Sequence, residues 1–168
     1  MTRLLRLALV PLLACAVAYG IYRCCYLPWR ADVERKRLET ITMALWKRQP
    51  IFASVRAREN VVAARNYLDR GIHNTGLYMA AAANYRLFDD LDDAAAMYRA
   101  ALRYDQRPEL YYNLGIIELD RRHRDQAKAA LVHAVLFNPW LIYDIDDPEM
   151  YRAAQAALAS RRLLFFPE

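Results

Sequence analysis

An internal repeat constrains this chain more than any other feature of its sequence. When residues 75–107 are aligned with residues 108–141 at an offset of 33, small and apolar residues coincide along both segments. Each segment holds two stretches with apolar residues at helical spacing, separated by a polar turn at 88–93 in the first and 121–125 in the second. Self-similarity at a period of about 20–50 residues is typical of arrays of one supersecondary unit. The repeat therefore predicts an all-α array of antiparallel helix pairs.

The composition favours the same fold class. The chain has 168 residues, of which 57% are hydrophobic and only four are glycine, and it is rich in alanine, the best helix former. So few glycines argue against turn-rich β-sandwiches and against disordered chains. The three cysteines are Cys15, Cys24 and Cys25, so disulfides cannot hold the remainder of the chain together.

Small and aromatic residues recur at defined positions of the two units. They are Tyr78, Ala82, Ala94 and Ala101 in the first, and Tyr111, Leu114, Gly115, Ala127, Ala134 and Pro139 in the second. The small residues stand where paired helices must approach closely, because a larger side chain would hold the helices apart. This pattern resembles the tetratricopeptide repeat (TPR) family. The second unit is the better match, since the first lacks the Leu-Gly pair and the proline.

The resemblance implies a short TPR-like α-solenoid, and two units are fewer than the three usually needed for stability. We therefore expect a helix at 51–72, closed by Gly71, to pack on the N-terminal side of the array. A helix at about 148–164 is expected to cap the C-terminal side, with Asp147 as its N-cap and Pro148 at its first position.

Function in this family, as the resemblance implies, is scaffolding. The first helices of successive units line a concave groove that binds a peptide or a helix of another protein. Carried over by position, the groove residues are Met79, Ala83, Arg86 and Leu87 from the first unit and Tyr112, Asn113, Ile116 and Asp120 from the second. Such a surface suits an apolar helix or an extended segment of a protein partner. The alternative for Met79 and Tyr112 is burial against a helix that stacks on the groove.

Catalytic and metal-binding chemistry has little support in the sequence. The acidic cluster at 144–149 lacks the glycine turn of a calcium loop, and a solvated capping loop explains it better. His73, His123 and His133 share no i, i+4 spacing that would suit zinc. The net charge of +5 comes from arginines interleaved with acids, whereas nucleic-acid binding needs cations gathered on one face. We predict a non-enzymatic protein with no cofactor, metal, nucleic acid or small-molecule substrate.

The N-terminus predicts a single membrane span. Residues 7–22 are uncharged and apolar, and Arg6 and the aromatic residues up to Trp29 extend a stretch that is slightly shorter than the roughly 20 residues a span needs. We divide the chain into an anchor at 1–28, a juxtamembrane helix at 29–50 that Pro50 ends, and a helical domain at 51–168. The alternatives are a cleaved signal peptide, a lipoprotein modified at Cys15, and a buried core helix.

The side of the membrane on which the body lies is less constrained. More basic residues follow the span than precede it, which by the positive-inside rule puts the body in the cytoplasm. A short basic tail directly before an apolar run is also the usual form of a signal anchor, which leaves the body outside. A cysteine-free body suits an oxidising compartment, so we favour the extracytoplasmic (periplasmic) side.

Together these features predict a single-pass membrane protein whose TPR-like body binds a membrane-associated protein partner. It would act as an assembly factor or accessory subunit of a membrane or envelope complex. The alternative is a small structural subunit that is permanently buried in such a complex and has no free groove. The apolar stretches at 138–143 and 163–166 are either core covers or docking patches for a membrane-embedded partner.

Overall fold

The computed structural model describes residues 3–48 and 53–165, and this part of the chain contains helices and turns without any strand. The predicted all-α class is therefore confirmed. The elements in chain order are α1 (Arg3–Ile21), the π-helical segment η1 (Tyr22–Tyr26), α2 (Leu27–Arg48), α3 (Ala53–Leu68), α4 (Thr75–Leu87), α5 (Leu91–Ala101), α6 (Pro108–Asp120), α7 (Arg124–Phe137), the 3₁₀-helix η2 (Pro139–Asp144) and α8 (Pro148–Phe165). Pro50 and Phe166, on which two predictions bear, lie outside the described residues.

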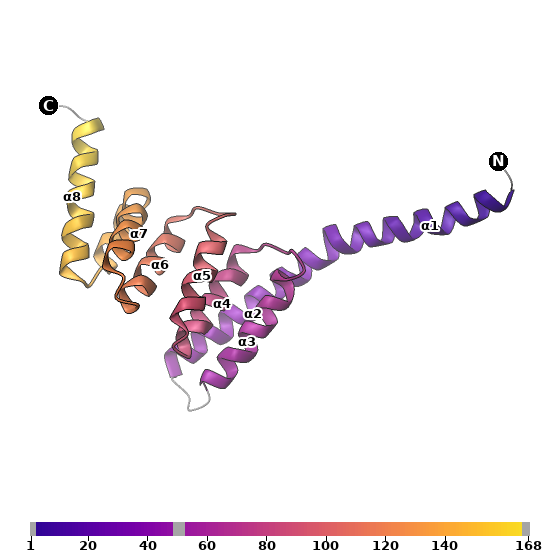
Figure 1. Cartoon of the computed structure of the whole chain (residues 1–168), viewed down its shortest axis with the longest axis horizontal. Helices are drawn as coiled ribbons and strands as arrows, with labels where there is room; N and C mark the ends of the chain where they lie inside the picture. Colours follow the sequence, from indigo (N-terminus) through magenta and orange to yellow (C-terminus); the bar gives the residue numbers. More distant parts are fainter. Residues whose placement is uncertain (1–2, 49–52, 166–168) are drawn as a thin grey trace.

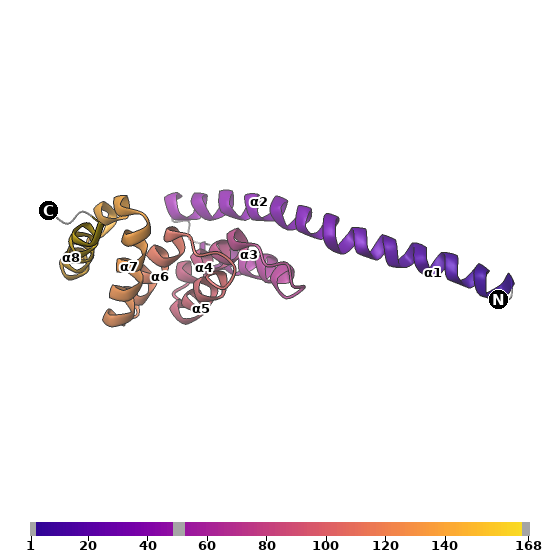
Figure 2. The same ribbon diagram turned by 90° about the horizontal axis from the view of Figure 1, so that it is seen from above.

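One long helix, formed by α1, η1 and α2, projects from the body (Figures 1 and 2). The π-helical segment precedes Pro28, which has no N–H to donate and whose ring crowds the carbonyl group four residues earlier. In compensation the Leu27 N–H donates to the Tyr22 carbonyl, five residues earlier, so the helix continues through the proline. The sequence predicted a separate juxtamembrane helix at 29–50, whereas the structure has one continuous helix across residues 27–30.

Within the described residues, the stretch Pro11–Lys47 is the one helix that is long and apolar enough to cross a membrane. Only 6% of its most apolar window is buried, and Leu12, for instance, is 74% exposed. The apolar N-terminal part of this helix is therefore not buried in the body, as the alternative of a buried core helix would require.

The remaining helices form antiparallel pairs that follow one another along the chain (Figure 1). Helix α4 pairs with α5, and α6 pairs with α7, and both the starts and the ends of α4 and α6 are 33 residues apart. Helices α2 and α3 form a further pair in front of them, and α8 packs on α7 at the other end. Aromatic residues at the same offset also make ring contacts. Tyr78 stacks on Tyr104 at 6.0 Å between ring centres, and the equivalent residues Tyr111 and Phe137 each contact His133, at 3.9 and 4.8 Å.

Three helices end in the same kind of turn. After α3, the Ile72 N–H donates to the Tyr67 carbonyl and the Gly71 N–H to the Leu68 carbonyl, with Gly71 at φ 77°, which is a Schellman motif. This motif ends α3 at Leu68, earlier than the predicted end at Ile72. Asp89 and Arg122 occupy the equivalent position after α4 and α6, each at φ 64°. Two of the three turns therefore place a residue with a side chain in the left-handed region.

The residues that recur between the repeated units form the contacts between paired helices. Most of these are buried: Tyr78, Ala82, Ala94, Ala101, Leu114, Gly115, Ala127 and Ala134. Tyr111 is half-buried, and Pro139 is exposed at the start of η2. At Gly115 the helices approach so closely that a Cβ atom would lie 2.6 Å from Leu131 Cγ. The close approach expected from the small residues is therefore present.

Helix α2 packs on α3 and α4 and is part of the helical body. It buries Leu27, Ala31, Leu38 and Leu45 on one face. A buried amide chain fixes its register: Asn84 Nδ2 on α4 donates to Thr42 Oγ1 at 2.7 Å, and Asn60 Nδ2 on α3 donates to Asn84 Oδ1 at 3.1 Å. Such a network satisfies its members in only one arrangement of the three helices.

Candidate partner-binding groove

A cavity of about 590 Å³ lies between the outer faces of α2, α4 and α6. Tyr98, from α5, lies among the residues that line it. The other side chains that define it are mainly apolar or small: Met43, Thr42 and Trp46 from α2, Met79, Ala80 and Ala83 from α4, and Ile117 from α6, with Glu39, Lys47, Arg86 and Asn113 as its polar members. This is the face that the first helices of the repeated units share.

The structure brings part of the predicted groove set together here. Met79, Ala83, Arg86 and Asn113 line the cavity. Leu87 and Asp120, with Arg86, line an adjoining cavity of about 630 Å³, whose other members include Leu45 and Trp46. An ion pair of 2.8 Å between Arg86 Nη2 and Asp120 Oδ2 connects α4 to α6 between the two cavities.

Tyr112 and Ile116 lie elsewhere. Both pack against the second hydrophobic cluster, which α7, η2 and α8 build around Val135 and Met150. The Tyr112 hydroxyl donates to the Asp144 carbonyl of η2 at 2.6 Å. Burial of its ring raises the pKa of Tyr112 above its usual range. The chain after α7 folds back over this side of α6 and covers the two residues, which are therefore not brought to the groove.

Sequence reasoning missed the contribution of α2 to this site. Met43 and Trp46 are 66% and 44% exposed and form one wall of the cavity. The Arg86 guanidinium lies 5.3 Å from the centre of the Trp46 ring, which fixes the indole against α4. The sequence contained an indication of this role. Residues 31–48 are amphipathic, and an array of helix pairs that begins at residue 75 needs a preceding pair to cover α4.

The groove has a neutral interior. Burial raises the pKa of Tyr98 to about 12, so its hydroxyl is uncharged at physiological pH. Glu39 is paired with Arg35 at 2.7 Å, and Arg86 is paired with Asp120. Lys47 adds an exposed positive charge to the lining. Such a surface can bind apolar side chains and a carboxylate at its rim.

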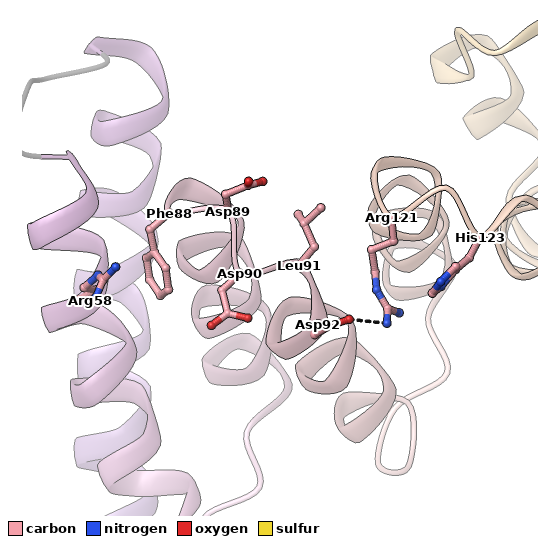
Figure 3. Close-up of a pocket in the computed structure, with 8 residues that line it drawn as sticks. All are labelled: Arg58, Phe88, Asp89, Asp90, Leu91, Asp92, Arg121 and His123. Carbon is pink, nitrogen blue, oxygen red and sulfur yellow. Dashed lines mark hydrogen bonds and ion pairs between the residues drawn. The ribbon is translucent and has the colours of Figure 1, made fainter.

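A third cavity, of about 570 Å³ and lined mainly by charged side chains, lies at the turns that follow α4 and α6 (Figure 3). The Arg58 guanidinium lies 4.9 Å from the centre of the Phe88 ring on one side, and Arg121 donates to Asp92 on the other. Asp92 points toward Arg121, whereas Asp89 and Asp90 point in other directions (Figure 3). With three aspartates, two arginines and a histidine, the lining carries charges of both signs.

Beside that cavity, the carboxylate of Glu118 is 1% exposed and has several donors. Arg121 Nη1 donates to its two oxygens at 3.0 and 2.9 Å, His123 Nδ1 lies 2.9 Å from Oε2, and Arg99 of α5 donates to Oε1. With its oxygens occupied in this way, the carboxylate joins α5 to α6.

The acidic cluster at 144–149 serves the N-terminus of α8. Asp147 Oδ1 accepts hydrogen bonds from the Glu149 and Met150 N–H groups, each at 3.0 Å, so the predicted N-cap is confirmed. The Met150 N–H, with the Glu149 N–H and Arg124, holds the pKa of Asp147 below its usual range. In the described part of the chain, no group of three or more His, Cys, Asp or Glu side chains is arranged to hold a metal ion.

No model of a known protein family matches this sequence, and no curated protein matches it significantly.

Proposed function

We propose that this protein is a non-enzymatic, membrane-anchored scaffold of the tetratricopeptide type that binds a protein partner next to the bilayer. The observation that carries the proposal is the cavity of about 590 Å³, whose wall combines α2 with the first helices of both repeated units. Met43 and Trp46 expose apolar surface there. Binding of an apolar segment would remove that surface from water, which is favourable.

The chemistry of the groove describes its ligand. An amphipathic helix or an extended segment would place apolar side chains against Met79, Ala83 and Ile117. A carboxylate on the same segment would pair with Lys47 at the rim. The apolar N-terminal helix supports single-pass anchoring, and the cysteine-free body supports the extracytoplasmic side. A scaffold held there suits an assembly factor or accessory subunit of a membrane or envelope complex.

A pair of matched variants tests the groove. Ala83→Glu places a charge in the cavity, whereas Ala96→Glu makes the same change at an exposed position of α5 outside it. The tagged full-length variants are purified from native membranes, and their co-purifying proteins are compared by mass spectrometry. We expect Ala96→Glu to retain the partner and Ala83→Glu to lose it, with both variants equally helical by circular dichroism. Retention of the partner by Ala83→Glu would contradict the groove assignment.

A second candidate is a small structural subunit that is permanently buried in a membrane complex. It is favoured by the exposed aromatic residues at the α7–η2 junction, where Phe137, Trp140 and Tyr143 are 61%, 76% and 73% exposed. Patches of this kind mark protein–protein contacts. In that case all of the protein migrates with one complex on native gels, and Ala83→Glu does not release it. A substantial free pool of the wild-type protein argues against this candidate.

A further inference from the structure

A row of large side chains runs along the face of the long helix that points away from the body. Helices α3 to α8 all lie on one side of α2, and its other side is clear (Figure 2). The row, which we call the outer stripe, consists of Tyr22, Tyr26, Trp29 and Val33, which are 41%, 48%, 59% and 43% exposed. Its members are four, three and four residues apart, and neighbouring rings are 5.6 and 6.0 Å apart between centres.

A lone membrane anchor does not require this arrangement. Interfacial tyrosines and tryptophans that only contact lipid headgroups would serve on any side of a helix. Here the aromatic residues between 20 and 30 are all on the stripe, and Val33 continues it beyond the segment that a bilayer would cover. Spacing of four and three residues is instead the pattern by which two helices pack along a common seam.

The charges that flank the outer stripe indicate what covers it. If Tyr26 and Val33 take a positions and Trp29 takes a d position of a heptad, Asp32 falls at g and Arg37 at the following e. In a parallel pair of identical helices, a g residue meets the e residue five positions later on the other helix. Asp32 of each copy would therefore face Arg37 of the other. The two side chains are 43% and 65% exposed. Within their own helix Asp32 pairs with Arg35 and Lys36, and Arg37 pairs with Glu34, so the contact across the seam would extend or replace these pairs.

Geometry favours the same occupant. Copies anchored in one membrane have the same orientation and depth, so the outer stripe of one meets the outer stripe of the other at the same level, as a two-fold axis requires. Because the body lies on one side of α2 (Figure 2), two copies joined through the opposite side would have their bodies on opposite sides of the seam. After Val33 the next seam positions are Lys36 and Thr40, which are polar, so the apolar seam ends at Val33.

We infer that two copies of this chain associate in parallel through the outer stripe. The inference rests on the membrane anchoring proposed above. It adds a second interaction surface that is independent of the groove.

Disulfide cross-linking of the full-length chain in its membrane tests this pairing. The exposed residues Cys15, Cys24 and Cys25 are first changed to alanine. Val33→Cys then places one thiol on the stripe, and Val62→Cys, at a 70% exposed position of α3, is the matched control. We expect mild oxidation to convert Val33→Cys, and not Val62→Cys, into a product of twice the monomer mass. No product, equal products, or a product with a different protein would each overturn the inference.

Charge exchange gives a second readout. Asp32→Arg should reduce the cross-linked fraction several-fold, and adding Arg37→Asp to the same chain should restore it. Failure of the second change to restore cross-linking would overturn the parallel register. Alkaline extraction of the same membranes distinguishes the two proposals: an inserted chain that gives no dimer refutes pairing alone, whereas a chain that is extracted refutes anchoring, and pairing with it.

Discussion

The buried carboxylate of Glu118 should make a large contribution to the stability of the body. It connects two helix pairs, because Arg99 of α5 and Arg121 and His123 of the turn after α6 all bind to it. The other polar contacts across this join, such as Arg86–Asp120 and Arg99–Gln126, involve more exposed side chains. Replacement by glutamine keeps the shape of the side chain and removes its charge. The glutamine amide would also direct its own N–H groups toward donors, so Glu118→Gln loses more than one hydrogen bond.

The magnitude follows from the exposure of each partner. Removing one member of a buried ion pair costs about 3–5 kcal/mol, because the other charge remains buried and unpaired. The Arg121 side chain is 17% exposed and would lose its buried partner, although it keeps the exposed Asp92. The Arg99 side chain is 45% exposed and can return to water, which reduces the cost. We therefore expect Glu118→Gln to lower the free energy of unfolding by about 2–4 kcal/mol, somewhat less than the loss for a fully buried pair, because Arg121 keeps Asp92 and Arg99 can return to water.

Thermal unfolding of the full-length chain in detergent, followed by circular dichroism, measures this loss. For a body of this size the change corresponds to a fall in Tm of roughly 10 °C. The control is Glu109→Gln, which removes the same charge from an exposed position in the first turn of α6. Its cost should not exceed about 1 kcal/mol, the usual contribution of an acid near a helix N-terminus. If the two variants unfold at the same temperature, Glu118 does not join the helix pairs as described.

Four further changes test the close contacts and caps by the same unfolding measurement. Gly115→Ala should destabilise the body by about 1–2 kcal/mol, because the added Cβ atom would lie 2.6 Å from Leu131 Cγ. The cost of this overpacking should exceed the free energy that alanine gains over glycine in helix propensity, so a more stable variant would contradict the close contact. Arg122→Gly should stabilise by up to about 1 kcal/mol, since it removes a side chain from the left-handed region, and a loss would show that the turn is not strained. Asn84→Leu should cost about 2 kcal/mol, because its buried hydrogen-bond partners are left unsatisfied, and a neutral effect would argue against the amide network. Asp147→Ala should cost about 1 kcal/mol at neutral pH through loss of the N-cap. Because the pKa of Asp147 is lowered in the folded state, its contribution is present above its ordinary pKa of 3.8 and is lost as the pH falls through the folded-state value; a constant difference down to acid pH would contradict this.

The sequence was sufficient to predict those features that depend on local periodicity. Apolar spacing located the helix pairs, and the offset of 33 between equivalent residues matches the offset between the bounds of α4 and α6. Gly71 indicated the end of α3, because glycine favours the left-handed conformation that ends a helix. Asp147 indicated the start of α8, because aspartate favours the N-cap position. Each of these predictions needs only a few neighbouring residues.

Features that depend on which elements meet were not predictable in this way. The amphipathic pattern of 31–48 shows that α2 buries one face, but it does not say that this face packs on α4 and leaves Trp46 in the groove. Tyr112 occupies a groove position by repeat alignment, yet η2 covers it, because the last unit has no following unit on that side. The left-handed turn at Arg122 gave no signal, since arginine does not favour that conformation.

The continuity of the long helix connects the two proposed surfaces. The long helix presents the outer stripe on one face, along η1 and the start of α2. Helix α2 buries its opposite face in the body, and its C-terminal half also forms a wall of the groove. The Arg23 side chain, from η1, donates to the Arg70 carbonyl at 2.7 Å and ties the same helix to the turn after α3. No flexible linker therefore separates the apolar N-terminal helix from the groove, because the π-helical segment lets the helix pass through Pro28 without a break. If the N-terminal helix crosses a bilayer, the groove lies at a fixed height and orientation above it. In that case the proposed scaffold would select partners by the distance of their binding segment from the membrane as well as by the chemistry of that segment.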